Sequence, residues 1–386
     1  MSIPDLSALS GDELDRVLNG PALEPPEGVT PDFVSHSGMN HVGYTIYTIF
    51  AVLGLSASLL RLGVRRHELK RFNIIEILLL LSLVFYIVFI ALGYQRLTVG
   101  RGQFLHQWDI PMWAMQYILY NNLIGMNIYS AGIGLIKSAV ILEWLRIFAP
   151  TRERNFFWWA SHIILWINII FYSFVLIAVN LSCLPHRRIW DRTVPGRCID
   201  IVNLELTTAV VNLTLDLITL LIPQKVIWKL QMSRQKKIGV SVVFAVGLLG
   251  VAAAAARVVA TARYMISDDR VWWFPSIAHA ALGEMTCGIL VLCVPLAPKA
   301  FAGLKASGIF KRMRGMSVSV PSASESAAHI RNPSSTQYSD TDERSVKWAK
   351  FPTQPSLQQP ASILHTTRIS TLDGPRKSEG IDDLWV

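Results

Sequence analysis

Seven long runs of apolar residues dominate this sequence and limit the folds that it can adopt. A helix of about 20 apolar residues is long enough to cross the ~30 Å hydrocarbon layer of a bilayer. The candidate spans are 42–60, 72–94, 123–147, 156–180, 207–227, 238–259 and 275–296, and we interpret 112–120 as an interfacial approach to the third of them. Charged residues make up only 16% of the chain, against ~25% in soluble domains. We therefore expect an all-α protein, a seven-transmembrane helix bundle.

The distribution of Lys and Arg predicts how these spans are oriented, because cytosolic loops of membrane proteins carry an excess of both residues. The segments 61–71, 146–154, 225–237 and 299–314 together carry eighteen of them, whereas the N-terminus and the three intervening loops carry nine. We therefore expect the N-terminus outside and the C-terminus in the cytosol. The net charge of +9 lies in these short clusters, which orient helices, so we expect no nucleic-acid partner.

The composition divides the 386 residues into four regions. Residues 1–40 are polar and acidic and should form the outer N-terminus, and 41–298 should form the seven-helix domain. Residues 299–314 are a basic juxtamembrane segment, either an amphipathic helix on the inner leaflet or a solvated linker. Residues 315–386 are rich in Ser, Thr, Pro and Gln, which predicts a disordered cytosolic tail. We expect the plasma membrane as the location, with an endomembrane as the alternative.

Four cysteines are present, and two of them flank one predicted outer loop. In an oxidising compartment Cys183 and Cys198 would form a disulfide that limits the freedom of this loop; the alternative is two unpaired thiols. Cys287 and Cys293 lie inside the last span, and no His accompanies them at a metal-binding spacing, so we expect no metal site. Asn180 begins a glycosylation sequon, but it lies close to the membrane, where a glycan is poorly placed.

Five residues within the spans are the candidates for a ligand site or polar core: Lys137, Asn212, Asp216, Arg257 and Glu284. A charge at the bilayer centre costs at least about 2.5 kcal/mol, so such groups usually have partners. At 1.5 Å per residue, Lys137 lies ~16 Å and Asp216 ~13 Å from the predicted inner face, which allows a pair, and Asn212 lies one turn from Asp216. Arg257 and Glu284 would pair in the outer half if their helices are neighbours. These groups either fix helix packing or form a polar pocket that binds a ligand or relays protons.

Two further acidic residues lie near the predicted inner face. Glu76 is close to the start of the second span, where we expect it to snorkel to the interface or to meet Arg71. Glu143 lies with Arg146 near the inner end of the third span, where we expect both side chains to be interfacial. Neither position therefore predicts a buried charge.

Motifs that would indicate a cofactor are absent. A retinal Schiff base of the microbial type needs a lysine in the last helix, and 275–298 contains none. The sequence also has no Walker A motif, no HExxH motif and no paired Asp-rich prenyltransferase motif. We therefore expect no cofactor and no catalytic residues.

A series of short motifs runs in order through residues 41–300. They are Gly100-Arg101-Gly102 with His106 and Asp109, Leu135-Ile136-Lys137-Ser138 followed by Glu143-Trp144-Leu145-Arg146-Ile147-Phe148, Cys183-Leu184-Pro185 with Trp190 and Gly196-Arg197-Cys198, Asn212 and Asp216 followed by Pro223, Arg257, and Glu284 followed by Pro295 and Pro298. In these motifs the sequence resembles the fungal rhodopsin-domain integral membrane proteins of the satratoxin-cluster type, which overlap with the pathogenesis-related seven-helix receptors of filamentous fungi. The resemblance implies seven helices, an outer N-terminus and a cytosolic tail, and it implies no retinal and no settled activity.

The residues and the resemblance together predict a non-enzymatic, receptor-like protein that senses a small apolar or amphipathic ligand and is associated with fungal secondary metabolism. Its partners would be the lipid bilayer, that ligand and a cytosolic signalling protein that contacts the loops and tail. The first alternative is a membrane-embedded cyclase or isomerase of a secondary-metabolite pathway, with Glu76, Asp216 and Glu284 as candidate acids. The second is a transporter, for which an internal repeat or a pair of broken helices would be expected.

Overall fold

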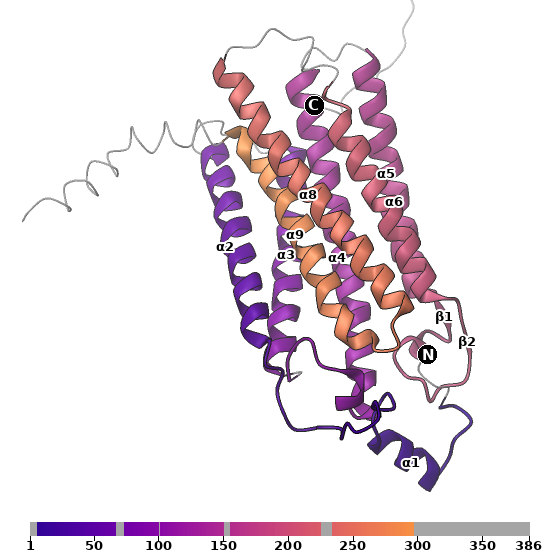
Figure 1. Cartoon of the computed structure of the whole chain (residues 1–386). Helices are drawn as coiled ribbons and strands as arrows, with labels where there is room; N and C mark the ends of the chain where they lie inside the picture. The colour runs from indigo at the N-terminus through magenta and orange to yellow at the C-terminus, as the bar shows by residue number, and fades with distance from the viewer. Residues whose placement is uncertain (1–5, 67–72, 100, 150–154, 225–233, 297–386) are drawn as a thin grey trace, which may run out of the picture. The chain divides into compact units, whose positions relative to one another are not determined.

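The computed structural model describes residues 6–66, 73–99, 101–149, 155–224 and 234–296, and most of these residues lie in helices (Figure 1). The helices are α1 (Asp12–Asn19), α2 (Asn40–Val64), α3 (Ile74–Thr98), α4 (Met112–Phe148), α5 (Phe156–Asn180), α6 (Ile201–Leu221), α8 (Arg234–Ile266) and α9 (Arg270–Cys293). Two short strands, β1 (Cys183–Leu184) and β2 (Arg197–Cys198), form an antiparallel pair between α5 and α6. The expected juxtamembrane segment 299–314 and tail 315–386 lie outside the described residues.

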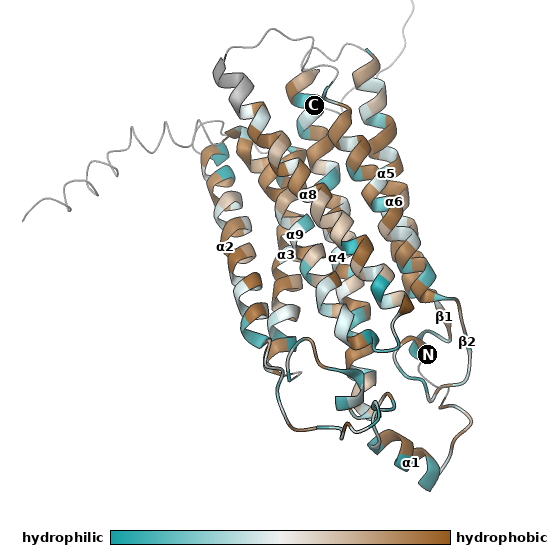
Figure 2. Cartoon of the chain, in the orientation of Figure 1, coloured by the Kyte–Doolittle hydropathy of each residue, from teal (hydrophilic) through white to brown (hydrophobic). Residues whose placement is uncertain are grey.

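Six of these helices are long and apolar enough to cross a membrane, namely α2, α3, α5, α6, α8 and α9 (Figure 2). The third expected span corresponds to α4, a continuous helix of 37 residues. Residues 112–120 are its first turns and continue directly into the expected span, and their interfacial position stays a prediction. Pro111 lies just before the helix, where its missing amide donor is tolerated, and no proline follows within α4 to interrupt it.

Helices α6 and α9 begin earlier than the apolar runs predict. α6 begins at Ile201 because Asp200 caps it: the Asp200 side chain accepts hydrogen bonds from the amides of Val202 and Asn203, at 3.1 and 3.2 Å. α9 begins before Pro275, which lies inside the helix. At α6, hydrogen bonding of the first amides rather than hydropathy therefore sets the start of the helix.

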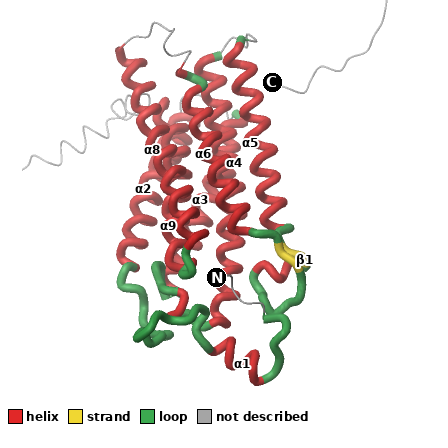
Figure 3. The backbone as a smooth tube through the Cα atoms, turned by 45° about the vertical axis from the view of Figure 1, so that its right-hand side comes forward, coloured by secondary structure: helices red, strands yellow, loops and turns green. Residues whose placement is uncertain are grey.

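The long helices lie side by side and alternate in direction (Figures 1 and 3). α2, α4, α6 and α9 begin at the end of the bundle that carries β1 and β2, which we call the disulfide end. α9 packs against α2, α4 and α8, and α4 packs against α3 and α5. The hydrophobic core lies between these helices and includes the fully buried Leu79, Ile136 and Leu282. On the outside of the bundle Trp166 is 61% and Leu249 63% exposed, which is the pattern that lipid-facing helices show.

The described part of the N-terminal region packs at the disulfide end (Figure 3). The amide of Ala22 donates to the carbonyl of Ile110 at 2.8 Å, and the amide of Met112 donates to the carbonyl of Gly20 at 3.0 Å. α1 has three acidic residues in its first turn, where the helix dipole favours them. Its apolar side contacts a small buried cluster that includes Val271. This segment is therefore attached to the starts of α4 and α9.

Candidate functional site

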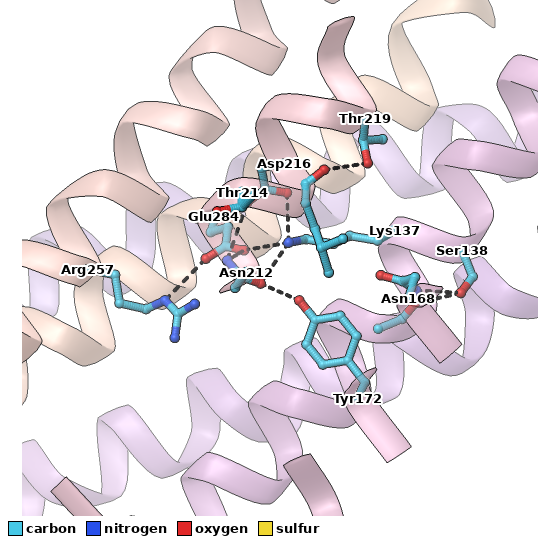
Figure 4. Close-up of polar contacts among 12 residues, drawn as sticks. Lys137, Ser138, Asn168, Tyr172, Asn212, Thr214, Asp216, Thr219, Arg257 and Glu284 are labelled. Atoms are coloured by element: carbon cyan, nitrogen blue, oxygen red, sulfur yellow. Dashed lines mark hydrogen bonds and ion pairs between the residues drawn. The ribbon is translucent and has the colours of Figure 1, made fainter. Parts of the chain in front are cut away.

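The five polar residues predicted within the spans meet at one place inside the bundle (Figure 4). The Nζ atom of Lys137 lies 2.7 Å from Oδ1 of Asp216 and 3.3 Å from Oε1 of Glu284. It also donates to Oδ1 of Asn212 at 2.7 Å. Arg257, from α8, approaches the same glutamate, with its Nε 3.3 Å from Oε2. The two pairs that were expected separately therefore form one network, because Glu284 contacts both cations.

Two tyrosines that were not among the predicted site residues complete this network. Tyr129 on α4 donates to Oε2 of Glu284 at 2.8 Å, and the Arg257 guanidinium lies 4.8 Å from the centre of its ring. Tyr172 on α5 donates to Oδ1 of Asn212. A buried tyrosine hydroxyl needs a hydrogen-bond partner. A tyrosine within an apolar span could therefore have indicated a polar neighbour at these two positions. We call the following seven residues the midspan network: Tyr129, Lys137, Tyr172, Asn212, Asp216, Arg257 and Glu284.

The midspan network balances its own charge. Lys137 and Arg257 are two cations, Asp216 and Glu284 are two carboxylates, and each cation lies within 3.3 Å of a carboxylate. Lys137 is 6%, Glu284 3% and Asn212 1% exposed. Close pairing offsets part of the free energy needed to remove each charge from water. A group that enters this network must therefore compete with contacts that are already made.

A cavity lies between the midspan network and the disulfide end. Its volume is about 1060 Å³, including the part that is open to its surroundings. Tyr129, Asn212 and Arg257 of the network form part of its wall, and much of the remaining wall is aromatic, with Phe89, Phe171 and Phe274 among its residues. An apolar wall with a few convergent polar groups is typical of small-molecule sites.

Two charged residues of the cavity wall were not among the predicted site residues. Arg96 on α3 donates through Nη1 to Oδ1 of Asn122 at 2.6 Å, and its guanidinium lies 4.8 Å from the centre of the Phe274 ring. Glu205 on α6 lines the same cavity. Arg96 follows the predicted end of the second span at 94, and Glu205 precedes the predicted start of its span at 207. Because α6 begins at Ile201, Glu205 belongs to the helix wall and not to the loop.

A second group of buried charges lies at the end of the bundle opposite the disulfide end, and it corrects two expectations. Glu76 does not snorkel: its Oε1 lies 3.2 Å from Nη2 of Arg61 and 2.9 Å from Nε of Arg65, and its side chain is 0% exposed. Arg71, the other partner expected for it, lies outside the described residues. Glu143 is a buried charge: it is 4% exposed, and its carboxylate lies 2.8 Å from Arg61 and 3.5 Å from Arg65.

We call Arg61, Arg65, Glu76 and Glu143 the α2 charge cluster. Its two arginines belong to the predicted cytosolic segment 61–71, but α2 continues to Val64 and brings them against α3 and α4. Arg61 also donates to the carbonyl of Leu292 on α9. The three acids proposed for a cyclase are thus divided between two places, with Glu76 in this cluster and Asp216 and Glu284 in the midspan network.

The expected disulfide is confirmed. Cys183 and Cys198 are bonded to each other and are also partners in the β1–β2 pair. The arginine-rich loop that they close has internal contacts, because Nε of Arg187 lies 3.0 Å from Oδ2 of Asp191. Asn180 is the last residue of α5, and its glycosylation stays a prediction.

The other two cysteines lie within α9, where Cys287 is half-buried and Cys293 buried. Across the described ranges, no group of three or more His, Cys, Asp or Glu side chains is arranged to hold a metal ion.

Known proteins resemble this chain over most of its helical part. Residues 60–302 match the family model of the fungal rhodopsin domain. The "Fugralins biosynthesis cluster protein 2" of Gibberella zeae is 35% identical over 308 residues, which cover 78% of this chain and 75% of that protein. A "SAT4 family membrane protein" of Emericella nidulans is 34% identical over 175 residues, which cover 45% of this chain and 44% of that protein. No solved structure matches the chain.

Proposed function

Because this chain belongs to the fungal rhodopsin-domain family of multi-span membrane proteins, we propose that it is a receptor-like protein that senses a small apolar or amphipathic ligand. In this proposal α4 also crosses the membrane, which brings the six candidate spans to seven. The N-terminus lies outside and the C-terminus in the cytosol, as the Lys and Arg counts predict. The disulfide end then faces the oxidising side of the membrane, where disulfides persist. We place the protein in the plasma membrane, with its cytosolic loops and tail available to a signalling partner.

The observation that carries this proposal is the contact between the cavity and the midspan network. Tyr129, Asn212 and Arg257 belong to both. The network side chains come from α4, α5, α6, α8 and α9, so a ligand that displaces one of them changes contacts on several helices at once. A ligand shifts a conformational equilibrium only through contacts that differ between the two states, and these shared residues supply such contacts.

The relative from the fugralin biosynthesis cluster supports an association with secondary metabolism. The chain aligns with 75% of that protein at 35% identity, so the similarity extends well beyond one motif. We propose that the ligand is a product or an intermediate of such metabolism, and that the receptor reports its concentration to the cell.

A deletion strain complemented with single variants tests this function. Gly125 lines the cavity, and a Cβ atom at this position would meet nothing within 4 Å, so Gly125→Leu should fill the cavity without disturbing the helix. Gly63→Leu is the matched control, because Gly63 has equal space around it and lies on the exposed side of α2. We expect Gly125→Leu to reproduce the transcript profile of the deletion strain and Gly63→Leu to restore the wild-type profile, with the intermediates of the pathway unchanged in both strains.

Three results would contradict the proposal. A precursor that accumulates in the deletion strain would indicate an enzyme. A product that is retained inside the cells would indicate a transporter. A Gly125→Leu strain that is indistinguishable from wild type would show that the cavity has no part in the response.

A further inference from the structure

We propose that the ligand of this cavity is an apolar molecule with a single acidic group, and that Arg96 binds this group. The inference rests on the proposed ligand-sensing function and adds the chemical class of the ligand. It depends on the charged residues that line this cavity and a second, adjoining cavity. The second cavity lies beside the loop closed by Cys183 and Cys198, which we call the disulfide loop. The two cavities share part of their wall, including Arg96, Asn122, Glu205 and Phe274.

The charges of these joined cavities do not balance. Arg257 is paired with a carboxylate of the midspan network, and Arg192 has contacts of its own in the disulfide loop. The other charged side chains of the two walls are Arg96, Arg270 and Glu205. Within the described part of the chain, none of these three lies within 4.0 Å of an opposite charge. Two of these three groups are cations and one is a carboxylate, so the joined walls favour an anionic group on the ligand.

Arg96 is held in a position that suits an acidic group. Its hydrogen bond to Asn122 of α4, at 2.6 Å, and its stacking on Phe274 of α9, at 4.8 Å, direct the guanidinium into the bundle and away from lipid. A guanidinium has five N–H donors, and the Asn122 oxygen accepts one of them. The planar fork of donors matches a carboxylate through two parallel hydrogen bonds, which a lysine ammonium cannot provide.

Arg270 and Glu205 further limit the charge that the ligand can carry. The Nε atom of Arg270 is buried and, among the described residues, has no hydrogen-bond partner, so this arginine adds positive potential at the start of α9. Glu205 would repel a second acidic group, which limits the ligand to one. The aromatic and aliphatic remainder of the wall stabilises an apolar body by removing its surface from water.

Such an acid has two sources, a small molecule from outside the cell or an anionic lipid of the surrounding leaflet. Both present one negative group on an apolar body, and the structure describes the chemistry that they share. A binding experiment in membranes of controlled lipid composition separates them.

The test uses the purified full-length protein in phosphatidylcholine nanodiscs, titrated at neutral pH with a dansyl-labelled undecanoic acid and with its methyl ester. We expect the wild-type protein to bind the acid saturably and more tightly than the ester. Arg96→Gln should weaken binding of the acid by at least about tenfold, the size of one charge-assisted hydrogen bond. Arg263→Gln is the matched control, because Arg263 is an exposed arginine of α8 outside both cavities, and it should bind as the wild type does.

Glu205→Gln provides a second test, in which the affinity for the acid should not fall. Removal of this negative charge should leave binding of the acid unchanged or make it tighter, whereas a purely structural role for Glu205 would make it weaker. Should Arg96→Gln fail to fold in a thermal-stability assay, Arg270→Gln replaces it, with weaker binding of the acid expected. Nanodiscs with added phosphatidylglycerol that compete with the probe would assign the acid to a lipid, and nanodiscs without competition would assign it to a small molecule; both results support an acidic ligand.

Three results would overturn the inference: equal binding of acid and ester by the wild type, equal effects of Arg96→Gln and Arg263→Gln, or no saturable binding of the acid. Its failure is distinguishable from failure of the receptor function. If the ester binds as well as the acid and Gly125→Leu abolishes both, the cavity binds ligands but does not select an acid. If the acid binds and the Gly125→Leu strain responds like wild type, the acid site exists but has no part in sensing.

Discussion

Arg61 shows what a single residue does inside this bundle. It is 1% exposed, it contacts Glu76 and Glu143, and it donates to the carbonyl of Leu292. Helices α2, α3, α4 and α9 therefore meet at one guanidinium. When one member of such a buried cluster is removed, the remaining charges lose their compensation, and this loss exceeds the net stabilisation that the intact cluster provides.

Arg61→Gln should therefore destabilise the protein strongly. We expect the free energy of unfolding to fall by about 3–5 kcal/mol, because two carboxylates remain buried with one cation fewer. Thermal unfolding of the purified protein in detergent, followed by tryptophan fluorescence, measures the change. Arg66→Gln is the control, since Arg66 is exposed one residue beyond Arg65, and its midpoint should stay close to that of wild type. Equal midpoints for the two variants would contradict the role of the α2 charge cluster.

Gly102 is the second residue whose replacement has a clear expected outcome. Its φ is +118°, and a Cβ atom would lie 2.1 Å from Oδ1 of Asn40, the atom that accepts a hydrogen bond from the amide of Gln103. Gly102→Ala should lower the free energy of unfolding by about 1–3 kcal/mol. Gly63→Ala, at a helical position with open space around it, should raise it by up to about 1 kcal/mol. Thermal midpoints of the two variants with the same sign of change would contradict this account.

At the level of elements, the connection between α5 and α6 is a small folded unit. The disulfide between Cys183 and Cys198 joins its two ends. Inside it, the Asp191 carboxylate accepts hydrogen bonds from the amide and hydroxyl of Thr193, at 3.1 and 2.6 Å, and contacts Arg187 at 3.0 Å. Partial burial alone would raise the pKa of Asp191, but the hydrogen bonds from Thr193 and the charge of Arg187 outweigh it and hold the pKa below its ordinary value of 3.8.

This lowered pKa predicts how the loop responds to acid. A carboxyl group whose pKa is lower in the folded than in the unfolded state stabilises the fold above the unfolded value and loses that contribution as the pH falls through the folded value. Asp191→Asn should therefore lower the thermal midpoint at neutral pH. The difference from wild type should begin to shrink as the pH falls below about 4 and should disappear once the pH is below the folded pKa. Glu27→Gln, at an exposed position of the N-terminal segment, should show no such difference at any pH. A constant difference for Asp191→Asn would contradict this explanation.

At the scale of the whole molecule, the two groups of buried charge lie at different levels along the bundle. The α2 charge cluster joins α2, α3, α4 and α9 away from the disulfide end, and the midspan network joins α4, α5, α6, α8 and α9 at the floor of the cavity. α4 and α9 belong to both groups. These two helices therefore connect the floor of the cavity with the opposite end of the bundle.

The proposed orientation makes a direct prediction for the whole chain. Eighteen Lys and Arg on one set of segments against nine on the other should place the N-terminus outside and the C-terminus in the cytosol. An N-terminal tag with a glycosylation site should become glycosylated. Protease added to intact cells should digest a C-terminal fluorescent protein only after the plasma membrane is permeabilised. Termini on the same side of the membrane would contradict seven spans.

The sequence by itself predicted a helical membrane protein, its family and the disulfide between Cys183 and Cys198. Of the seven spans that it predicted, six are helices long and apolar enough to cross a membrane in the described part of the chain. These properties depend on the length of apolar runs and on short distances along the chain, which one sequence states directly. It also placed Lys137 and Asp216 at similar depths, because depth follows from the rise per residue of a helix.

Only the tertiary structure decided which helices are neighbours. It joined the two expected pairs through Glu284, brought Arg61 and Arg65 inside against Glu76 and Glu143, and set Arg96 and Glu205 in one cavity wall. A helix that is apolar on nearly all sides does not show which face meets a partner. The positions of its few polar groups are settled when packing brings their partners from other helices within hydrogen-bond distance.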